Sequence, residues 1–342
     1  YFYRNKMEFT FSNKRWLTVE EVQSEAEIED KDALGFHVPG MFDKVINLNN
    51  CHLQKEPSNA IRLSVKQFAD EKGLSYFDIR NQEGLLRNLM IRTSSTNDLM
   101  VLVQFYENDI KSINLLMEHI KTSFPEITSL LYIINQKANN TMYDQEVVCY
   151  NGEDYIMEEM DGLHFKIGAK SFFQTNSEQA KVLYRKTKEL AQITENDLVY
   201  DLYTGTGTIA QYVATSAKKV VGIDSVEEGI KAAYENAERN NIVNCTFYTG
   251  DMKEIFTDEF IAKNGTPDVI ITDPPRDGMH KKVVEQILKI GAKRIVYVSC
   301  NSATQARDLA LMDEKYKVSH IQPVDMFPQT HHVENIVVLE LK

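Results

Sequence analysis

Cys300 is the side chain of this sequence best suited to nucleophilic chemistry. It ends an apolar, strand-like run at residues 296–300, and Asn301 follows as the start of a predicted helix. Ligands bind at the carboxyl ends of parallel strands, and the start of a helix is expected to lower the pKa of a nearby thiol. A lone cysteine is more often a buried packing residue. We interpret Cys149 and Cys245, which lie in ordinary strand-like sequence, in that way.

Glu334 is the candidate general base. It lies in the segment 328–335 (PQTHHVEN), just before the last predicted strand. A metal site with His331 and His332 is one alternative, but the sequence offers no third ligand at a recognisable spacing. A structural hydrogen bond at the start of the strand is another. A carboxylate that removes a proton fits the rest of the sequence better.

A glycine-rich turn and an acidic residue indicate a cofactor that contains ribose. Gly205 and Gly207 follow a short apolar strand, where glycine lets the backbone approach a ligand closely. Asp224 ends the next predicted strand, a position from which a carboxylate accepts hydrogen bonds from ribose hydroxyls. The spacing Gly205-x-Gly207-x-x-Ala210 also fits the loose dinucleotide pattern, and a structural turn without a ligand is a further alternative. We find no partner for hydride transfer, which disfavours a dinucleotide.

The loop 273–276 (DPPR) follows another predicted strand. It resembles the loop of amino-group methyltransferases, in which an aromatic residue after the prolines stacks on the flipped base. Arg276 occupies that position here, so methylation of an exocyclic nitrogen is disfavoured.

A cysteine, a base and a methyl donor together suit the methylation of uracil at C5. C5 is a weak nucleophile toward the methyl group of a sulfonium. Addition of a thiolate at C6 gives an enolate with charge on C5 and O4, and C5 then attacks the methyl group. A base must finally remove the C5 proton so that the thiolate can leave. The sequence offers one candidate for each part.

Two regions with different patterns must position these residues. Residues 1–162 mix strands and helices and predict an α+β domain, whereas residues 163–342 alternate strands with helices and predict a doubly wound, mostly parallel α/β sheet. In the second region we predict strands at 198–202, 219–223, 245–248, 269–272, 294–299 and 336–341, and helices at 177–191 and 226–240. In the first we predict strands at 7–11, 85–93, 99–107 and 130–135, and helices at 58–72 and 108–123.

The composition favours a packed, cytoplasmic protein without a membrane partner. The 342 residues are 43% hydrophobic and 26% charged, no apolar run approaches the roughly 20 residues of a membrane span, and no signal peptide is recognisable. Four scattered cysteines without a CxxC pair indicate a reducing compartment. The net charge of −12 argues against a general nucleic-acid coat, but a local basic cleft would still allow an RNA enzyme.

Five motifs together resemble the RNA uridine-C5 methyltransferases. They are FFQTN at 172–176, DLYTG at 201–205, DPPRDG at 273–278, VSCN at 298–301 and QTHHVE at 329–334, in the order that the family has. The resemblance covers essentially the whole chain and is greatest to the subgroup that modifies 23S ribosomal RNA, with the transfer-RNA subgroup as the nearest alternative. It implies a Rossmann-like catalytic domain that uses S-adenosyl-L-methionine to form 5-methyluridine.

The resemblance also implies a role for individual residues. Cys300 would add to C6 of the uridine, and Glu334 would remove the C5 proton. The residues that would line the S-adenosyl-L-methionine site are Gln174, Tyr203, Thr208, Asp224, Asp251 and Asp273, and Asp273 would also contact the target base.

Some positions depart from the family's usual pattern. Thr204 and Asp224 replace a more common Cys and Glu, and both changes keep the required chemistry. Many ribosomal-RNA members also carry an N-terminal OB-like domain and a four-cysteine iron–sulfur site. Cys51 resembles the fourth of those cysteines and the other three would precede Tyr1, so we expect a truncated chain that cannot hold the cluster. An RNA-binding protein without turnover in this truncated form is the alternative function.

Overall fold

The computed structural model of the protein describes residues 1–24, 28 and 30–342, which form two compact units. The first unit comprises Tyr1–Glu158 and Ile167–Lys170, and the second comprises Glu159–Lys166 and Ser171–Lys342. The expected boundary after residue 162 falls inside the stretch in which the chain passes from one unit to the other.

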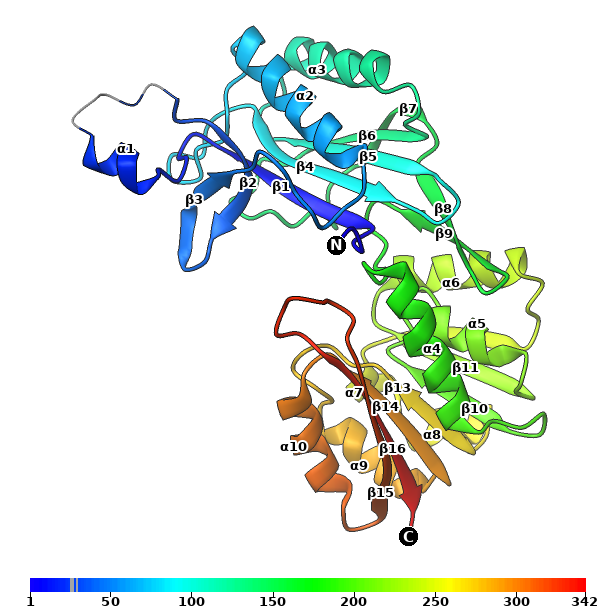
Figure 1. Ribbon diagram of the computed structural model, residues 1–342. Helices are drawn as coiled ribbons and strands as arrows, with labels where there is room; N and C mark the ends of the chain where they lie inside the picture. Colours follow the sequence, from blue (N-terminus) through cyan, green and yellow to red (C-terminus); the bar gives the residue numbers. More distant parts are fainter. Residues whose placement is uncertain (25–27, 29) are drawn as a thin grey trace. The chain divides into compact units, whose positions relative to one another are not determined.

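The first unit is a seven-stranded sheet with α2 and α3 packed on one face (Figure 1). Its strands, in spatial order, are β3 (Met41–Asn47), β2 (Ala33–Val38), β1 (Lys6–Ser12), β4 (Leu86–Thr93), β5 (Leu99–Phe105), β6 (Ser129–Ile134) and β7 (Val148–Gly152). Its helices are α1 (Val19–Gln23), α2 (Ser58–Lys72) and α3 (Ile110–Ser123). Neighbouring strands are antiparallel except β5 and β6, which α3 connects. The expected α+β architecture is confirmed.

The helices of this unit form because apolar side chains recur at helical spacing. Ile61, Val65 and Ala69 of α2 and Leu116 and Ile120 of α3 are buried against the sheet. A short hairpin of β8 (Tyr155–Met160) and β9 (Leu163–Gly168) follows and contains residues of both units.

The second unit is a seven-stranded sheet covered by helices on both faces (Figure 1). Its strands, in spatial order, are β12 (Cys245–Thr249), β11 (Lys219–Asp224), β10 (Leu198–Leu202), β13 (Val269–Thr272), β14 (Arg294–Ser299), β16 (Glu334–Leu341) and β15 (Tyr316–Val324). The helices on one face are α4 (Ser177–Ala191), α5 (Thr208–Ala214) and α6 (Glu227–Arg239). Those on the other face are α7 (Met252–Ile255), α8 (Asp258–Asn264), α9 (Lys281–Ile290) and α10 (Ser302–Met312).

The strand directions in this sheet are mixed. The first five strands in spatial order are parallel, as expected for a doubly wound fold, but β16 is antiparallel to both β14 and β15. The sequence analysis did not predict β15. Its residues between Tyr316 and Val324 are largely exposed, as is usual for an edge strand, so they lack the alternation that marks a half-buried strand.

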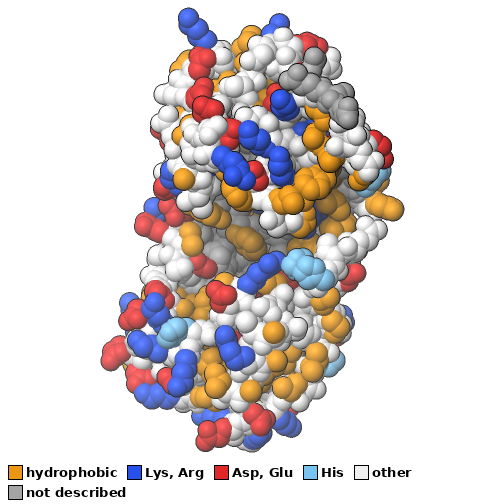
Figure 2. Space-filling view, turned by 90° about the vertical axis from the view of Figure 1, so that its left-hand side faces the viewer, with side chains coloured by type: hydrophobic (Ala, Val, Ile, Leu, Met, Phe, Trp, Pro, Cys, Tyr) orange, Lys and Arg blue, Asp and Glu red, His pale blue; other side chains and the backbone are white. Residues whose placement is uncertain are grey.

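The surface carries both signs of charge. Figure 2 shows acidic and basic side chains interspersed over the face drawn, in agreement with a chain whose net charge is negative without being strongly polarised. No helix among the described residues combines the length and the apolar character needed to cross a membrane.

Candidate active site

The candidate residues of the second unit gather at one edge of its sheet. The carboxyl ends of β10, β11, β13 and β14 meet at this edge because those strands are parallel. Since β16 runs in the opposite direction, it starts there. Cys300 comes directly after β14, and Glu334 is the first residue of β16.

The register of β14 and β16 places Cys300 beside Glu334. Ser299 pairs with Asn335, so the next residue of one strand lies opposite the preceding residue of the other. Gln305 of α10 fixes this register by donating hydrogen bonds to the carbonyl oxygens of Tyr297, at 2.9 Å, and Asn335, at 3.2 Å. Its side-chain oxygen also accepts from Asn335 at 2.7 Å. The nucleophile and base inferred from the sequence are therefore neighbours, brought together from positions 34 residues apart.

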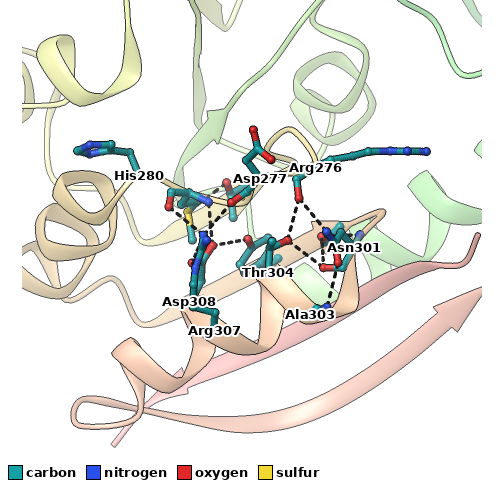
Figure 3. Close-up of polar contacts among 12 residues, drawn as sticks. Arg276, Asp277, His280, Asn301, Ala303, Thr304, Arg307 and Asp308 are labelled. Carbon is teal, nitrogen blue, oxygen red and sulfur yellow. Dashed lines mark hydrogen bonds and ion pairs between the residues drawn. The ribbon is translucent and has the colours of Figure 1, made fainter.

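Arg276 is the residue of this site that sequence reasoning missed. Its carbonyl oxygen accepts hydrogen bonds from Asn301 and Thr304, both at 3.0 Å (Figure 3). Its positive charge lowers the pKa of the Cys300 thiol and of the Glu334 carboxyl. From the sequence, Arg276 was interpreted only as a missing aromatic residue, because its proximity to Cys300 depends on tertiary structure.

A single buried carboxylate holds the loop that carries Arg276. Asp308 of α10 accepts hydrogen bonds from Met279 N at 2.8 Å and from Tyr297 Oη at 2.7 Å. Arg307 bonds the other oxygen of Asp308 and the carbonyl oxygen of Asp277, both at 2.8 Å. Figure 3 shows these contacts linking the loop after β13 to α10. The loop, β14 and α10 thus form one hydrogen-bonded assembly.

The electrostatics of Cys300 differ from the expectation. Asn301 caps α10 by accepting from Ala303 N at 3.1 Å, so the predicted helix start is confirmed. The expected lowering of the thiol pKa is wrong, however: burial and the negative charges of Glu334 and Asp273 raise the pKa of Cys300. Arg276 opposes them only in part. The protonated thiol is therefore favoured over the thiolate at neutral pH in this structure.

Two carboxyl groups beside Cys300 also have raised pKa values. Burial raises the pKa of Glu334 to about 7, with Arg276 acting in the opposite direction. The pKa of Asp273 is raised well above its usual value by burial, then by the charges of Glu334 and Asp201. A carboxylate whose pKa lies near 7 is well matched to removing a proton at neutral pH.

The glycine-rich turn leaves a buried acceptor unused. Asp201 is buried, and its Oδ2 accepts from Thr204 Oγ1 at 2.6 Å and from Ala210 N at 3.0 Å. Its Oδ1 has no hydrogen-bond partner among the residues that the structure describes. A buried acceptor without a partner lowers the stability of the fold unless a ligand or a water molecule supplies a hydrogen-bond donor. Burial raises the pKa of Asp201 to about 7.

The backbone of this turn has two residues with left-handed φ values and leaves space beside Gly205. Tyr203 has a φ of 66°, which is unusual for an aromatic residue and indicates local backbone strain. Gly205 has a φ of 56°, and a Cβ at this position would meet no heavy atom within 4 Å. Asp224 accepts hydrogen bonds from Gly205 N at 2.9 Å and from Val226 N at 2.8 Å, which leaves further lone pairs for a ligand.

The other residues expected at the cofactor site lie around the same edge. Asp251 caps α7 and pairs with Lys253 at 3.0 Å, with its side chain exposed. The charges of Asp224 and Asp251 both act on Tyr203 and help burial raise its pKa. Gln174 is buried close to Tyr184 and lowers the pKa of that side chain, which burial and the charges of Asp273 and Glu334 raise. Thr208 is the first residue of α5, with its Oγ1 3.2 Å from that of Thr206.

The remaining cysteines occupy different environments. Cys245 is in β12, and burial raises its pKa to about 12, as expected for a packing residue. Cys149 is exposed, so its interpretation as a packing residue is wrong: its strand, β7, is at the edge of the first sheet. Cys51 is buried, and its backbone is bonded to Asn59. No three His, Cys, Asp or Glu side chains within residues 1–24, 28 and 30–342 gather as metal ligands would. One thiol does not fit an iron–sulfur cluster.

Known proteins resemble this chain in sequence and structure. The model of the tRNA (uracil-5-)-methyltransferase family matches residues 137–342. An uncharacterized RNA methyltransferase of Bacteroides thetaiotaomicron is 57% identical over all of this chain and 76% of its own length. The chain belongs to this methyltransferase family. Another relative, an uncharacterized RNA methyltransferase of Porphyromonas gingivalis, is 56% identical over 99% of this chain and 74% of its own length.

A family member of known structure has the same fold. The tRNA (uracil-54, C5)-methyltransferase of Pyrococcus abyssi, solved in complex with S-adenosyl-L-homocysteine, superposes with a TM-score of 0.79. It is 29% identical to this chain and covers 98% of it, while this chain covers 76% of the Pyrococcus protein. The expected Rossmann-like methyltransferase fold is thus confirmed.

The assembly around Asp308 predicts that Gly278→Ala will reduce activity. Gly278 has a φ of 76°, and a Cβ there would lie 2.7 Å from both Arg307 Nη2 and Asp308 Oδ2. Left-handed strain costs about 1–3 kcal/mol. Displacement of Arg276 should slow methyl transfer by about tenfold or more, since small misplacements of reacting groups cost up to about 10²-fold. Denaturant unfolding and a methyl-transfer assay measure the two effects.

Gly73→Ala is the matched control, because Gly73 has a φ of 64° with open space around it. It should lose some stability and keep full activity. Equal activity of the two variants would show that the fit of the loop against α10 is unimportant.

Proposed function

We propose that this protein methylates C5 of uridine in RNA through a covalent bond between Cys300 Sγ and C6. The observation that carries the proposal is the pairing of Ser299 with Asn335, which places a thiol and a carboxylate side by side. The residues around the glycine-rich turn would hold S-adenosyl-L-methionine next to them.

Each protein group has a distinct task in this reaction. The Cys300 thiolate adds to C6, and the electrons of the C5–C6 double bond move toward C5 and O4. Arg276, whose positive charge lowers the pKa of the thiol, stabilises the thiolate before addition and after elimination. Bound S-adenosyl-L-methionine supplies the methyl group to C5. Glu334 then takes the C5 proton, and the electrons left behind reform the double bond and expel the thiolate.

The residues present fit S-adenosyl-L-methionine. The unpartnered Asp201 Oδ1 suits a donor from the ligand, the open space at Gly205 allows close approach, and Asp224 has lone pairs available for ribose hydroxyls. The S-adenosyl-L-homocysteine bound by the Pyrococcus abyssi relative supports the same assignment. Gln174, Tyr203, Thr208, Asp251 and Asp273 complete the proposed site.

Ribosomal RNA is the first substrate to test, because the five motifs resemble that subgroup most. Transfer RNA is the second, because the Pyrococcus relative is a tRNA (uracil-54, C5)-methyltransferase. The four free cysteines suit a reducing, cytoplasmic location. Transcribed, unmodified ribosomal and transfer RNA, incubated with the protein and S-adenosyl-L-methionine and then mapped for 5-methyluridine, distinguish the two substrates. Absence of 5-methyluridine from both would favour an RNA-binding protein without turnover.

We predict that Asp224→Ala weakens S-adenosyl-L-methionine binding by about tenfold or more. Loss of a charged acceptor typically costs about 1.5–3 kcal/mol. Asp224 also holds two backbone N–H groups, so the variant will melt at a lower temperature even without ligand. Glu227→Ala, an exposed substitution in the first turn of α6, is the control. Calorimetry that gives the same affinity for both variants would place the ribose elsewhere.

Cys300 and Glu334 should act at different stages. Cys300→Ala should form neither a covalent complex nor a product, because C5 is never activated. Glu334→Gln should still add and methylate, but loss of the base slows proton removal by about 10²–10⁴. A methylated protein–RNA complex should then accumulate and appear as a shifted band on a denaturing gel. Normal turnover of Glu334→Gln would reduce Glu334 to a structural role, and a complex formed by Cys300→Ala would identify a different nucleophile.

The raised pKa values predict activity that increases with pH. Glu334 is protonated below about pH 7 and cannot then accept the C5 proton, so kcat should fall as the pH decreases below that value. The raised pKa of Cys300 should extend the increase to higher pH. Glu334→Gln removes a negative charge beside the thiol, so its complex should form at lower pH than that of the wild type. An unchanged pH profile for complex formation would contradict the electrostatic coupling of the two residues.

A further inference from the structure

An open groove of about 700 Å³ lies next to Cys300 on the second unit. Arg276 and Cys300 line one part of it, and Ile321, Pro323, His331 and His332 line another. Sites for drug-sized ligands have volumes of about 300–1,000 Å³, so the groove has room for more than one pyrimidine ring.

The groove lies on the far side of Cys300 from the glycine-rich turn. The turn follows β10, and Asp224 ends β11, whereas the groove residues come from the loop after β13, the end of β14, β15, and β16 with the segment before it. In the spatial order of the sheet, β13, β14, β16 and β15 all lie on the side of β10 that faces away from β11. A uridine ring at Cys300 would therefore have the cofactor on one side and the groove on the other.

The chemistry of the groove suits a nucleotide. None of the described residues that line it is acidic, although the chain carries a net charge of −12. Arg276 provides a positive charge for a phosphate, and the rings of His331 and His332 lie 4.1 Å apart as surfaces on which a base can stack. Ile321 is 60% exposed in an edge strand, where an uncovered apolar side chain promotes aggregation.

We propose that this groove binds the nucleotide adjacent to the target uridine in an unpaired stretch of RNA. Its base stacks on His331, its sugar covers Ile321, and its phosphate lies near Arg276. An unpaired strand is required because C5 and C6 of a stacked, paired uridine are out of reach of a side chain. This inference depends on the proposed function and adds to it a binding site for the flanking sequence.

The test uses the full chain and a short unpaired RNA centred on the uridine mapped in the methylation assay. Removal of one flanking base, by an abasic nucleotide, should weaken binding to the wild type by about tenfold, a typical effect of losing one stacked base. Ile321→Asp and His331→Ala should weaken binding of the intact RNA to a similar degree. Replacing the intact RNA by the abasic RNA should lower the affinity of these two variants only slightly, because their contact with the flanking nucleotide is already lost. Their affinity for S-adenosyl-L-methionine should equal that of the wild type.

Val318→Asp and His320→Ala are the matched controls, since both residues are exposed on β15 and neither lines the groove. They should bind RNA as the wild type does. The inference is overturned if RNA with an abasic nucleotide before the uridine and RNA with one after it both bind as tightly as the intact RNA. It is also overturned if Ile321→Asp and Val318→Asp bind RNA equally well, as they would if the groove bound a protein segment. Failure of the proposed function gives a different result, namely no covalent complex between the wild type and any RNA.

Discussion

The antiparallel pairing of β16 with β14 is the constraint on which the rest of the active site depends. A doubly wound sheet brings the carboxyl ends of its parallel strands to one edge, and each strand can deliver a functional residue there. A final strand running the other way contributes its first residue at that edge. Glu334 therefore lies beside Cys300, and Asn335 is bonded to the helix that follows Cys300. Had β16 been parallel to β14, Glu334 would lie at the opposite edge of the sheet, a strand length away from Cys300.

The site combines burial with an excess of negative charge. Asp201, Asp273 and Glu334 all have raised pKa values, and burial is the largest cause for each. Asp273 and Glu334 in turn raise the pKa of Cys300. This arrangement disfavours a resting thiolate, so the free protein carries a weakly reactive thiol. It favours proton uptake by Glu334, which the last step of the proposed reaction requires. The positive charge of Arg276 lowers the pKa values of both Cys300 and Glu334, and so moderates both effects.

Local signals in the sequence were enough to predict the parallel strands of the second unit and the residues that end them. Apolar runs such as 269–272 predicted buried strands, and Gly205 and Asp224 indicated the edge at which we propose that the cofactor binds. Edge strand β15 was missed because an exposed strand needs no alternation of apolar residues. Arg276 and the groove were missed because contacts between separate loops leave no spacing in the sequence. The direction of the Cys300 pKa shift depends on neighbours from two other strands, which local sequence could not supply.

The carboxylate of Asp308 has a consequence for how this family can vary. It bonds a backbone N–H of the loop after β13 and a side chain of β14, and the neighbouring Arg307 bonds it and a further loop carbonyl. A change at Asp308 alone would leave Tyr297 and Met279 N as buried donors without an acceptor. Homologous sequences should therefore replace Tyr297, Arg307 and Asp308 as a group or keep all three. Covariation among these positions would indicate whether the loop after β13 has the same geometry, even in relatives whose structures are undetermined.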